Sequence, residues 1–144
     1  MFSVSSSAIF CHRAAERAIH LVHLAGNGEE WVVTIFEKIV RREIPADIVW
    51  EDDDVLAFRD VNPQAPVHVL IVPKRVVARL ADATEADQAL LGKLLLASRT
   101  VAEKLDLLTS GYRVVINSGP DAGESVPHLH VHVLGKRALA WPPG

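Results

Sequence analysis

Three histidines at alternate positions offer the strongest candidate for chemistry in this sequence. His128, His130 and His132 are separated by Leu129 and Val131 near the end of a chain of 144 residues. In an extended strand alternate side chains share a face, so the three imidazoles are expected to point one way, toward solvent, and the apolar residues between them into a core. Packing alone does not explain three aligned imidazoles, whereas catalysis and metal binding commonly use histidine.

Metal binding is one chemistry that this spacing could support. Two histidines at positions i and i+2 can share one zinc ion, but the outer two attachment points of the run lie about 13 Å apart along a strand. Because zinc–nitrogen bonds are only about 2.0–2.1 Å long, three histidines of one strand cannot converge on a single ion without breaking the strand. A zinc site would need a ligand from elsewhere, such as His68, and it stays open as an alternative.

Nucleophilic attack on phosphorus is the other chemistry. A neutral imidazole nitrogen can attack phosphorus and form a covalent intermediate, provided that an acceptor fixes its other ring nitrogen. Neighbouring histidines can supply charge to phosphate oxygens and a proton to a leaving group. The preceding loop contains Gly119 and Gly123, which allow backbone N–H groups to approach an anion, and the hydroxyl of Ser125. The run and its loop together indicate a phosphate site.

Hydrophobic periodicity and turn signals predict the elements that must position this site. Thr34 is expected to cap a short helix, with Glu37 at capping-box spacing and Pro45 as its stop. Strands are expected at residues 48–51, 55–60, 67–72, 112–117 and 128–134, the fourth of them an inner strand, with a long helix opened by Thr84 before it. The helix carries an apolar stripe expected to face a sheet: Leu90, Leu91, Leu94, Leu95, Val101 and Leu105. Short turns join the strands, so the predicted class is α+β with an antiparallel sheet.

Composition narrows the class of protein and its partners. The chain has 49% hydrophobic residues, a net charge of −3 and one cysteine, Cys11, which suits a single domain with a packed core and excludes an internal disulfide framework. No basic surplus exists to neutralise a nucleic acid. No apolar run reaches the roughly 18–20 residues of a membrane span. Neither nucleic acid nor a membrane is therefore an expected partner.

Residues 1–33 are predicted to be an N-terminal extension, and residues 34–144 the domain itself. Residues 1–23 contain Arg13 and Arg17 and a single acid, a composition compatible with an organellar transit peptide. Residues 25–30 are expected to be a linker. The expected location is the cytoplasm, or a mitochondrion or another organelle if the extension is a targeting segment.

Residues 123–135 resemble the histidine triad motif, His-x-His-x-His followed by apolar residues. The resemblance covers about residues 34–144. Within this range the sequence is similar to the histidine triad nucleotide-binding branch at residues 35–40, 44–46, 51–53, 57–60, 63–68, 111–113 and 141–144. The closing Trp-Pro-Pro-Gly favours this branch over the dinucleoside polyphosphate hydrolases. His132 argues against the hexose-1-phosphate uridylyltransferases, which usually have glutamine there.

The resemblance implies a HIT-like fold, with a five-stranded antiparallel sheet, one short and one long helix, and a homodimer whose sheets join into one of ten strands. It implies a purine nucleoside phosphoramidase that acts on adenosine 5′-monophosphoramidate-like substrates through a nucleotidyl-histidine, with no metal or other cofactor. His130 matches the nucleophile, and the other implied catalytic residues are His128, His132, Ser125 and His68. The implied nucleotide-binding residues are Asp60 for the ribose, Phe36, Ile39, Phe58 and Val61 for the base, Asn117, Gly123 and Ser125, and Trp141, which would reach the partner's site.

Several of these residues also have a plain structural interpretation. Phe36 and Ile39 share a helix face and could belong to the core. Asp60 and Asn117 could be ordinary turn residues, and a tryptophan such as Trp141 near a chain end often only packs.

Three positions depart from the branch. Glu124 stands where glutamine is common, and a carboxylate facing the site would repel a phosphate. Pro127 stands where an aromatic residue is common and removes one N–H, and Lys136 replaces a usual glycine. These differences bear on leaving-group preference and efficiency, so a nucleotide-binding or scaffolding protein with little catalysis is the second hypothesis.

Overall fold

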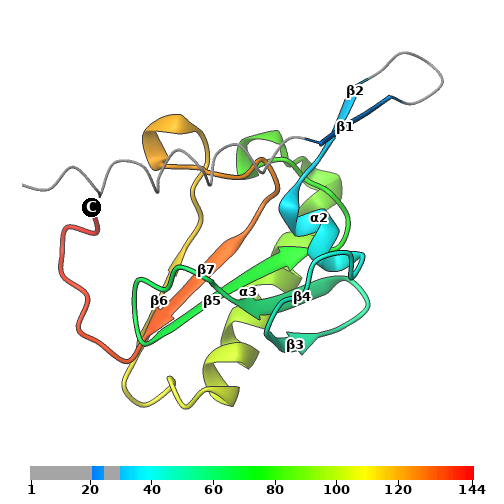
Figure 1. Cartoon of the computed structure of the whole chain (residues 1–144). Helices are drawn as coiled ribbons and strands as arrows, with labels where there is room; N and C mark the ends of the chain where they lie inside the picture. The colour runs from blue at the N-terminus through cyan, green and yellow to red at the C-terminus, as the bar shows by residue number, and fades with distance from the viewer. Residues whose placement is uncertain (1–20, 25–29) are drawn as a thin grey trace, which may run out of the picture.

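The computed structural model describes residues 21–24 and 30–144 of the chain (Figure 1). Its centre is an antiparallel sheet of five strands in the order β3-β4-β5-β7-β6. The strands are β3 (Ile48–Glu51), β4 (Val55–Arg59), β5 (Val67–Pro73), β6 (Tyr112–Val115) and β7 (Val131–Gly135). The last strand, β7, lies between β5 and β6 (Figure 1), and the sheet with its two helices confirms the predicted α+β class.

The two helices cover opposite faces of the sheet because side chains alternate along each strand. The long helix α3 (Gln88–Lys104) packs on the face to which Val69 and Ile71 of β5 point. The short helix α2 (Ile35–Val40) packs on the face of Leu70 and Val72. His68 of β5 and His132 of β7 lie on this second face as well, because each is next in the strand to residues that face α3.

The predicted cap of α2 is confirmed. The Thr34 hydroxyl accepts the N–H of Glu37 at 3.2 Å, and the Glu37 carboxylate accepts the N–H of Thr34 at 2.8 Å. This capping box satisfies two of the N–H groups that have no partner inside the helix. The helix ends earlier than the sequence indicates, because Arg42 adopts a left-handed φ of 63°, three residues before Pro45.

The long helix differs from the prediction in its start and in its buried stripe. Thr84 caps the short 3-10 turn η3 (Glu85–Asp87), and α3 begins only at Gln88. The stripe that faces the sheet contains Leu94, Ala97, Ser98 and Val101, at steps of three and four. The prediction for Leu95 is wrong: it lies one residue, about 100°, around the helix from Leu94 and is 55% exposed.

Other strand predictions also need correction. The strand expected at residues 112–117 is β6, which ends at Val115 and lies at an edge of this chain's sheet, so the prediction of an inner strand is wrong. Residues 21–33 contain an unpredicted antiparallel pair, β1 (Leu21–Leu24) and β2 (Glu30–Val33), so Glu30 belongs to a strand and not to a linker.

The expected targeting segment falls mainly on residues 1–20, and most of the expected linker on residues 25–29, outside the described part of the chain. The domain boundary at residue 34 stays a prediction. Among the helices of the described residues, none combines the length and the apolar character needed to cross a bilayer.

Candidate active site

The histidine run lies on the α2 face of the sheet, and most of it is buried. His132 in β7 is paired with Leu70 of β5, which fixes its side chain on that face. Leu129 and Val131 enter the opposite core beneath α3, so the predicted alternation holds although regular strand structure begins only at Val131. The prediction that the imidazoles face solvent is wrong for His128 and His130, which are 0% and 4% exposed, because α2 covers them.

A hydrogen bond holds the ring of His130 at Nδ1 and leaves Nε2 without a hydrogen bond to the described part of the chain. Its Nδ1 lies 2.7 Å from the backbone carbonyl of His128. A carbonyl can only accept, so Nδ1 carries the proton and the lone pair lies on Nε2. The edge-to-face ring of Phe36, with 5.1 Å between ring centres, packs against the imidazole. This is the tautomer and the restraint that a nucleophilic imidazole needs.

His128 is a neutral imidazole with both ring nitrogens in use. Its Nε2–H donates to the carbonyl of Pro73 at 2.8 Å, and its Nδ1 lies 3.2 Å from the hydroxyl of Thr34. Burial lowers the pKa of His128; the Pro73 hydrogen bond and the charge of Glu37 oppose that effect, and His130 adds to it. In this arrangement His128 has no ring nitrogen left to contact a phosphate, although its own carbonyl holds His130.

His68 and His132 form a hydrogen-bonded pair of imidazoles. The backbone N–H of Gln64 donates to Nδ1 of His68 at 3.0 Å, which puts the proton of neutral His68 on Nε2. That Nε2 lies 2.9 Å from Nδ1 of His132 and 3.4 Å from the carboxylate of Asp60. His132 therefore accepts at Nδ1 and keeps its own proton on Nε2.

The Nε2–H of His132 is a buried donor with no hydrogen-bond partner among the described residues. The ring lies beside that of His130, with 5.0 Å between ring centres. Burial, then the charges of His130 and His68, lower the pKa of His132 to about 4, against a smaller opposing effect of Asp60. A buried polar group without a partner is costly, so this N–H is available to donate to an acceptor of a bound molecule.

The loop before the run holds the Glu124 carboxylate in contacts that compensate its charge. Gly119 and Gly123 have φ values of 90° and 77°, a left-handed conformation that favours glycine. The carboxylate of Glu124 accepts the N–H of Gly119 at 2.9 Å and pairs with Arg79 at 2.9 Å. Arg79, from the segment before the 3-10 turn at Leu80–Asp82, therefore compensates the charge of Glu124, and this carboxylate is not free to repel a phosphate.

A family model for the HIT domain matches residues 41–139. The chain belongs to the HIT family. An uncharacterized HIT-like protein of Synechococcus elongatus is 63% identical over 77% of this chain and 96% of its own length. The 14 kDa zinc-binding protein of Zea mays is 54% identical over 77% of this chain and 88% of its own length.

Solved structures of this family are similar to the chain. A HIT family hydrolase from Legionella pneumophila has 44% sequence identity and a TM-score of 0.75, over 76% of this chain and 98% of its own. A histidine triad nucleotide-binding protein from Candida albicans has 30% identity and a TM-score of 0.64, over 75% and 82% of the two chains. These matches confirm the resemblance to the histidine triad superfamily, while the nucleotide-binding branch stays a prediction.

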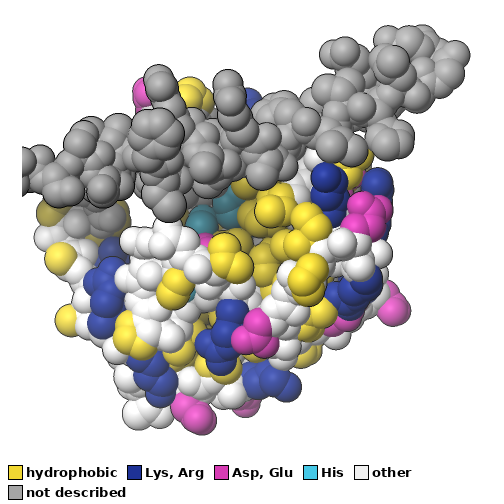
Figure 2. Space-filling view, in the orientation of Figure 1, with side chains coloured by type: hydrophobic (Ala, Val, Ile, Leu, Met, Phe, Trp, Pro, Cys, Tyr) yellow, Lys and Arg dark blue, Asp and Glu magenta, His cyan; other side chains and the backbone are white. Residues whose placement is uncertain are grey.

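The HIT domain has an apolar wall beside the histidines. Phe36, Ile39 and Phe58 are buried together, and the rings of Phe36 and Phe58 pack edge to face with 5.7 Å between centres. In Figure 2 histidine side chains are visible through an opening of this face, next to hydrophobic side chains. Val61 and Trp141, in contrast, are 100% and 84% exposed in the single chain, and neither belongs to this wall.

The remaining expected binding residues lie on the loops around the run. Asn117 is half-buried just after β6, and Ser125 is exposed three residues before His128. Asp60 is half-buried, accepts the N–H of Asn62 at 2.8 Å and faces His68.

The residues that could hold a metal in this HIT domain are not the three histidines of the run. Asp60, His68 and His132 offer ligand atoms that lie within 4.8 Å of one another. Ligands of tetrahedral zinc lie about 3.3 Å apart when the bonds are about 2.0–2.1 Å long, whereas His68 and His132 are hydrogen-bonded at 2.9 Å. A metal could enter only by opening that bond, and the two imidazoles satisfy each other without it.

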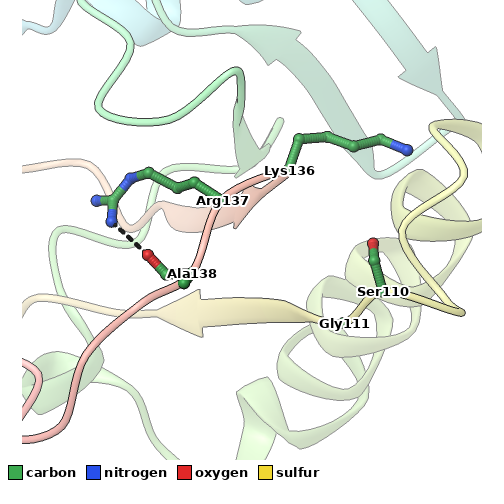
Figure 3. Close-up of a pocket in the computed structure, with 5 residues that line it drawn as sticks. All are labelled: Ser110, Gly111, Lys136, Arg137 and Ala138. Atoms are coloured by element: carbon green, nitrogen blue, oxygen red, sulfur yellow. Dashed lines mark hydrogen bonds between the residues drawn. The ribbon is translucent and has the colours of Figure 1, made fainter.

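A separate pocket of about 500 Å³ lies beyond the other end of β7, lined by Ser110, Gly111, Lys136, Arg137 and Ala138. Its two cationic side chains extend in opposite directions (Figure 3). Arg137 donates hydrogen bonds to the carbonyls of Gln64 and Ala138. The pocket therefore presents no converging pair of charges, and it contains no residue of the histidine run.

Sequence reasoning missed three groups that hold the histidines. Thr34 was interpreted only as a helix cap, and the carbonyl of Pro73 and the N–H of Gln64 were not considered. Thr34 and His128 are 94 residues apart in the chain. No local pattern marks such a contact, which depends on how α2 and β5 pack around the run.

Proposed function

We propose that this HIT protein hydrolyses the P–N bond of purine nucleoside phosphoramidates such as adenosine 5′-monophosphoramidate, with His130 as the nucleophile. The observation that carries the proposal is the pair of adjacent imidazoles, one with a fixed lone pair on Nε2 and the other, His132, with an unpartnered N–H. Similarity to a HIT family hydrolase and to a histidine triad nucleotide-binding protein supports a hydrolase that acts on a nucleotide.

The first step is attack of His130 on the α-phosphorus. The Nε2 lone pair forms a bond to phosphorus, the P–N bond of the substrate breaks, and the amine leaves with that electron pair and takes a proton from water. The Nε2–H of His132 donates to a phosphate oxygen, where negative charge develops. Because His68 fixes Nδ1 of His132, this donor needs no reorganisation during the reaction.

The second step hydrolyses the nucleotidyl-histidine. Water attacks phosphorus, the P–Nε2 bond breaks, and its electron pair returns to His130 while a proton from water goes to solvent. The products are the nucleoside monophosphate and the free enzyme. Throughout both steps the carbonyl of His128 keeps the proton of His130 on Nδ1.

The nucleotide itself is placed by residues around the histidines. The apolar wall of Phe36, Ile39 and Phe58 suits a purine base, and the Asp60 carboxylate suits the ribose hydroxyls. Gly123, Ser125 and Asn117 border the phosphate side, where backbone and side-chain donors are available.

A second copy of the chain is the proposed partner. β6 is an edge strand with Val114 partly exposed, and Leu95 and Leu96 of α3 are 55% and 67% exposed. Pairing two such edges would join two sheets into one of ten strands and cover this apolar surface, and it would offer the exposed Trp141 a place against the other copy.

The test of the reaction is a His130→Ala variant assayed with a fluorogenic adenosine phosphoramidate. Loss of more than about 1,000-fold in kcat with an unchanged circular dichroism spectrum is expected, since a group that forms the covalent bond cannot be replaced. Glu103→Gln on the exposed side of α3 is the matched control. A His132→Ala variant mixed with substrate should gain the mass of one nucleotide on His130. Normal turnover by His130→Ala would refute the proposal.

Zinc binding is the second candidate, favoured by the cluster of Asp60, His68 and His132 and by the name of the Zea mays relative. Elemental analysis of protein purified without added metal distinguishes the two. The hydrolase proposed above keeps its activity in a chelator, whereas an activity that depends on zinc does not.

A further inference from the structure

Thr34 does more in this structure than cap a helix. Its side chain is buried at 2% exposure, and its oxygen lies 3.2 Å from two nitrogens: the backbone N of Glu37 and Nδ1 of His128. Glu37 is the donor in the cap, so that contact uses only a lone pair of the hydroxyl. A hydroxyl has one proton as well, and this proton is free to be donated to His128.

The state of His128 requires that donor. Nε2 carries the proton given to Pro73, so Nδ1 is an acceptor in a fully buried ring. The Glu37 carboxylate cannot fill this place, because it has no proton to give and is engaged by the N–H of Thr34 and by Arg41. Phe36 meets the ring only with an apolar edge-to-face contact. Thr34 is therefore the side chain that satisfies Nδ1.

His128 in turn holds the nucleophile. Its backbone carbonyl accepts the Nδ1–H of His130 at 2.7 Å. The ring of His128 is anchored at two points, Thr34 on one side and Pro73 on the other, and a ring anchored in this way restrains the backbone that carries the carbonyl. A continuous chain of hydrogen bonds and covalent structure thus runs from the start of α2 to the attacking nitrogen.

We propose that Thr34 is a positioning residue for the nucleophile: by donating to Nδ1 of His128, its hydroxyl keeps the His128 carbonyl where it orients His130. This inference rests on the proposed function for its kinetic consequence, but not for its structural one. Capping alone would not select a hydroxyl, because aspartate and asparagine cap helices as well as serine or threonine.

Three substitutions separate the two roles of Thr34. Thr34→Ser keeps both the cap and the donor. Thr34→Asp keeps the cap, but an ionised carboxylate has no proton and can only accept from Nδ1 of His128. Thr34→Val keeps the shape and loses both roles. Each variant is assayed for kcat and KM with the fluorogenic adenosine phosphoramidate, and the ring nitrogens of His128 are followed by NMR in protein labelled with ¹⁵N-histidine.

Thr34→Ser should stay within about threefold of the parent kcat. Thr34→Val should lose about 10- to 100-fold in kcat with little change in KM, the cost of a misplaced reacting group. Thr34→Asp should show a similar loss only at a pH where Nδ1 of His128 is unprotonated, because the carboxylate then has no proton to donate to it. In the aspartate variant Nδ1 of His128 should become protonated and its pKa should rise, because the carboxylate stabilises the charged ring. A structural role confined to the helix cap would not move this signal.

Two results would overturn the inference. One is parent-like kcat in both Thr34→Asp and Thr34→Val with unchanged His128 signals. The other is rescue by aspartate equal to that by serine at a pH where the NMR signals show Nδ1 of His128 to be unprotonated, which would mean that only the cap matters. If the valine variant does not fold, the comparison of aspartate with serine still decides. If the parent protein does not cleave phosphoramidates, the proposed function fails, while the NMR signals of His128 still test the contact with Thr34.

Discussion

The half-buried imidazole of His132 makes the stability of the protein depend on pH. Its pKa is lowered to about 4 in the folded protein from an ordinary value of 6.5, chiefly by burial. The unfolded chain therefore binds more protons than the folded one between these two values. Stability is fully present above pH 6.5 and is lost as the pH falls toward 4.

The size of the effect follows from the two pKa values. One pKa unit corresponds to about 1.4 kcal/mol. With pKa values of 6.5 and about 4, His132 alone lowers the free energy of unfolding by about 2 kcal/mol between pH 7 and pH 5, and by about 3 kcal/mol when titration is complete. Burial lowers the pKa of His68 and His128 as well, so their contributions have the same sign.

The assay is urea denaturation at a series of pH values from 7 to 4.5, for the parent protein and for His132→Gln. Glutamine can still accept the N–H of His68 but does not titrate. The difference in unfolding free energy between the two proteins should shrink or reverse by about 2 kcal/mol from pH 7 to pH 5. A difference that is constant over this range would show that His132 is not held neutral by its surroundings.

Two further predictions concern the loop and the end of β7. Glu124→Gln keeps an acceptor for the N–H of Gly119 but loses the charge facing Arg79. We therefore expect the free energy of unfolding, measured by urea denaturation, to fall by about 1 kcal/mol. The same substitution in an Arg79→Gln background should cost nothing, and an equal loss in both backgrounds would contradict the ion pair. A Cβ on Gly135 would lie 2.7 Å from Cδ2 of the buried Leu107. Gly135→Ala should therefore cost about 1–3 kcal/mol by overpacking, measured as a lower Tm, and Leu107→Ala should absorb part of that cost; additive losses would refute the steric explanation.

Local signals predicted the elements of this protein well and their contacts poorly. The capping box at Thr34 and the alternation through Leu129 and Val131 depend only on residues close together in the sequence, and both are present in the structure. The choice between Leu94 and Leu95 as the buried residue of α3 was not predictable in the same way. Both fit an apolar stripe, and only the position of the sheet decides between them.

The candidate site shows the same division. The sequence indicates the imidazoles, but it does not show that His128 is buried or which nitrogen of each ring carries the proton. Those properties come from Pro73, 55 residues away, and from the N–H of Gln64 on a loop. Strand order is equally non-local: β6 follows α3 in the chain, yet β7 separates it from β5.

The carbonyl that orients His130 carries no formal charge, and this affects the lifetime of the covalent state in the proposed reaction. In hydrolases with a Ser-His-Asp triad, a carboxylate stabilises the histidine when it becomes positive. A nucleotidyl group on Nε2 would make the ring of His130 positive, and the amide oxygen of His128 offers only a dipole to balance that charge. The imidazole of the nucleotidyl-histidine would thus stay a good leaving group, so that water releases the nucleotide and the covalent intermediate does not accumulate.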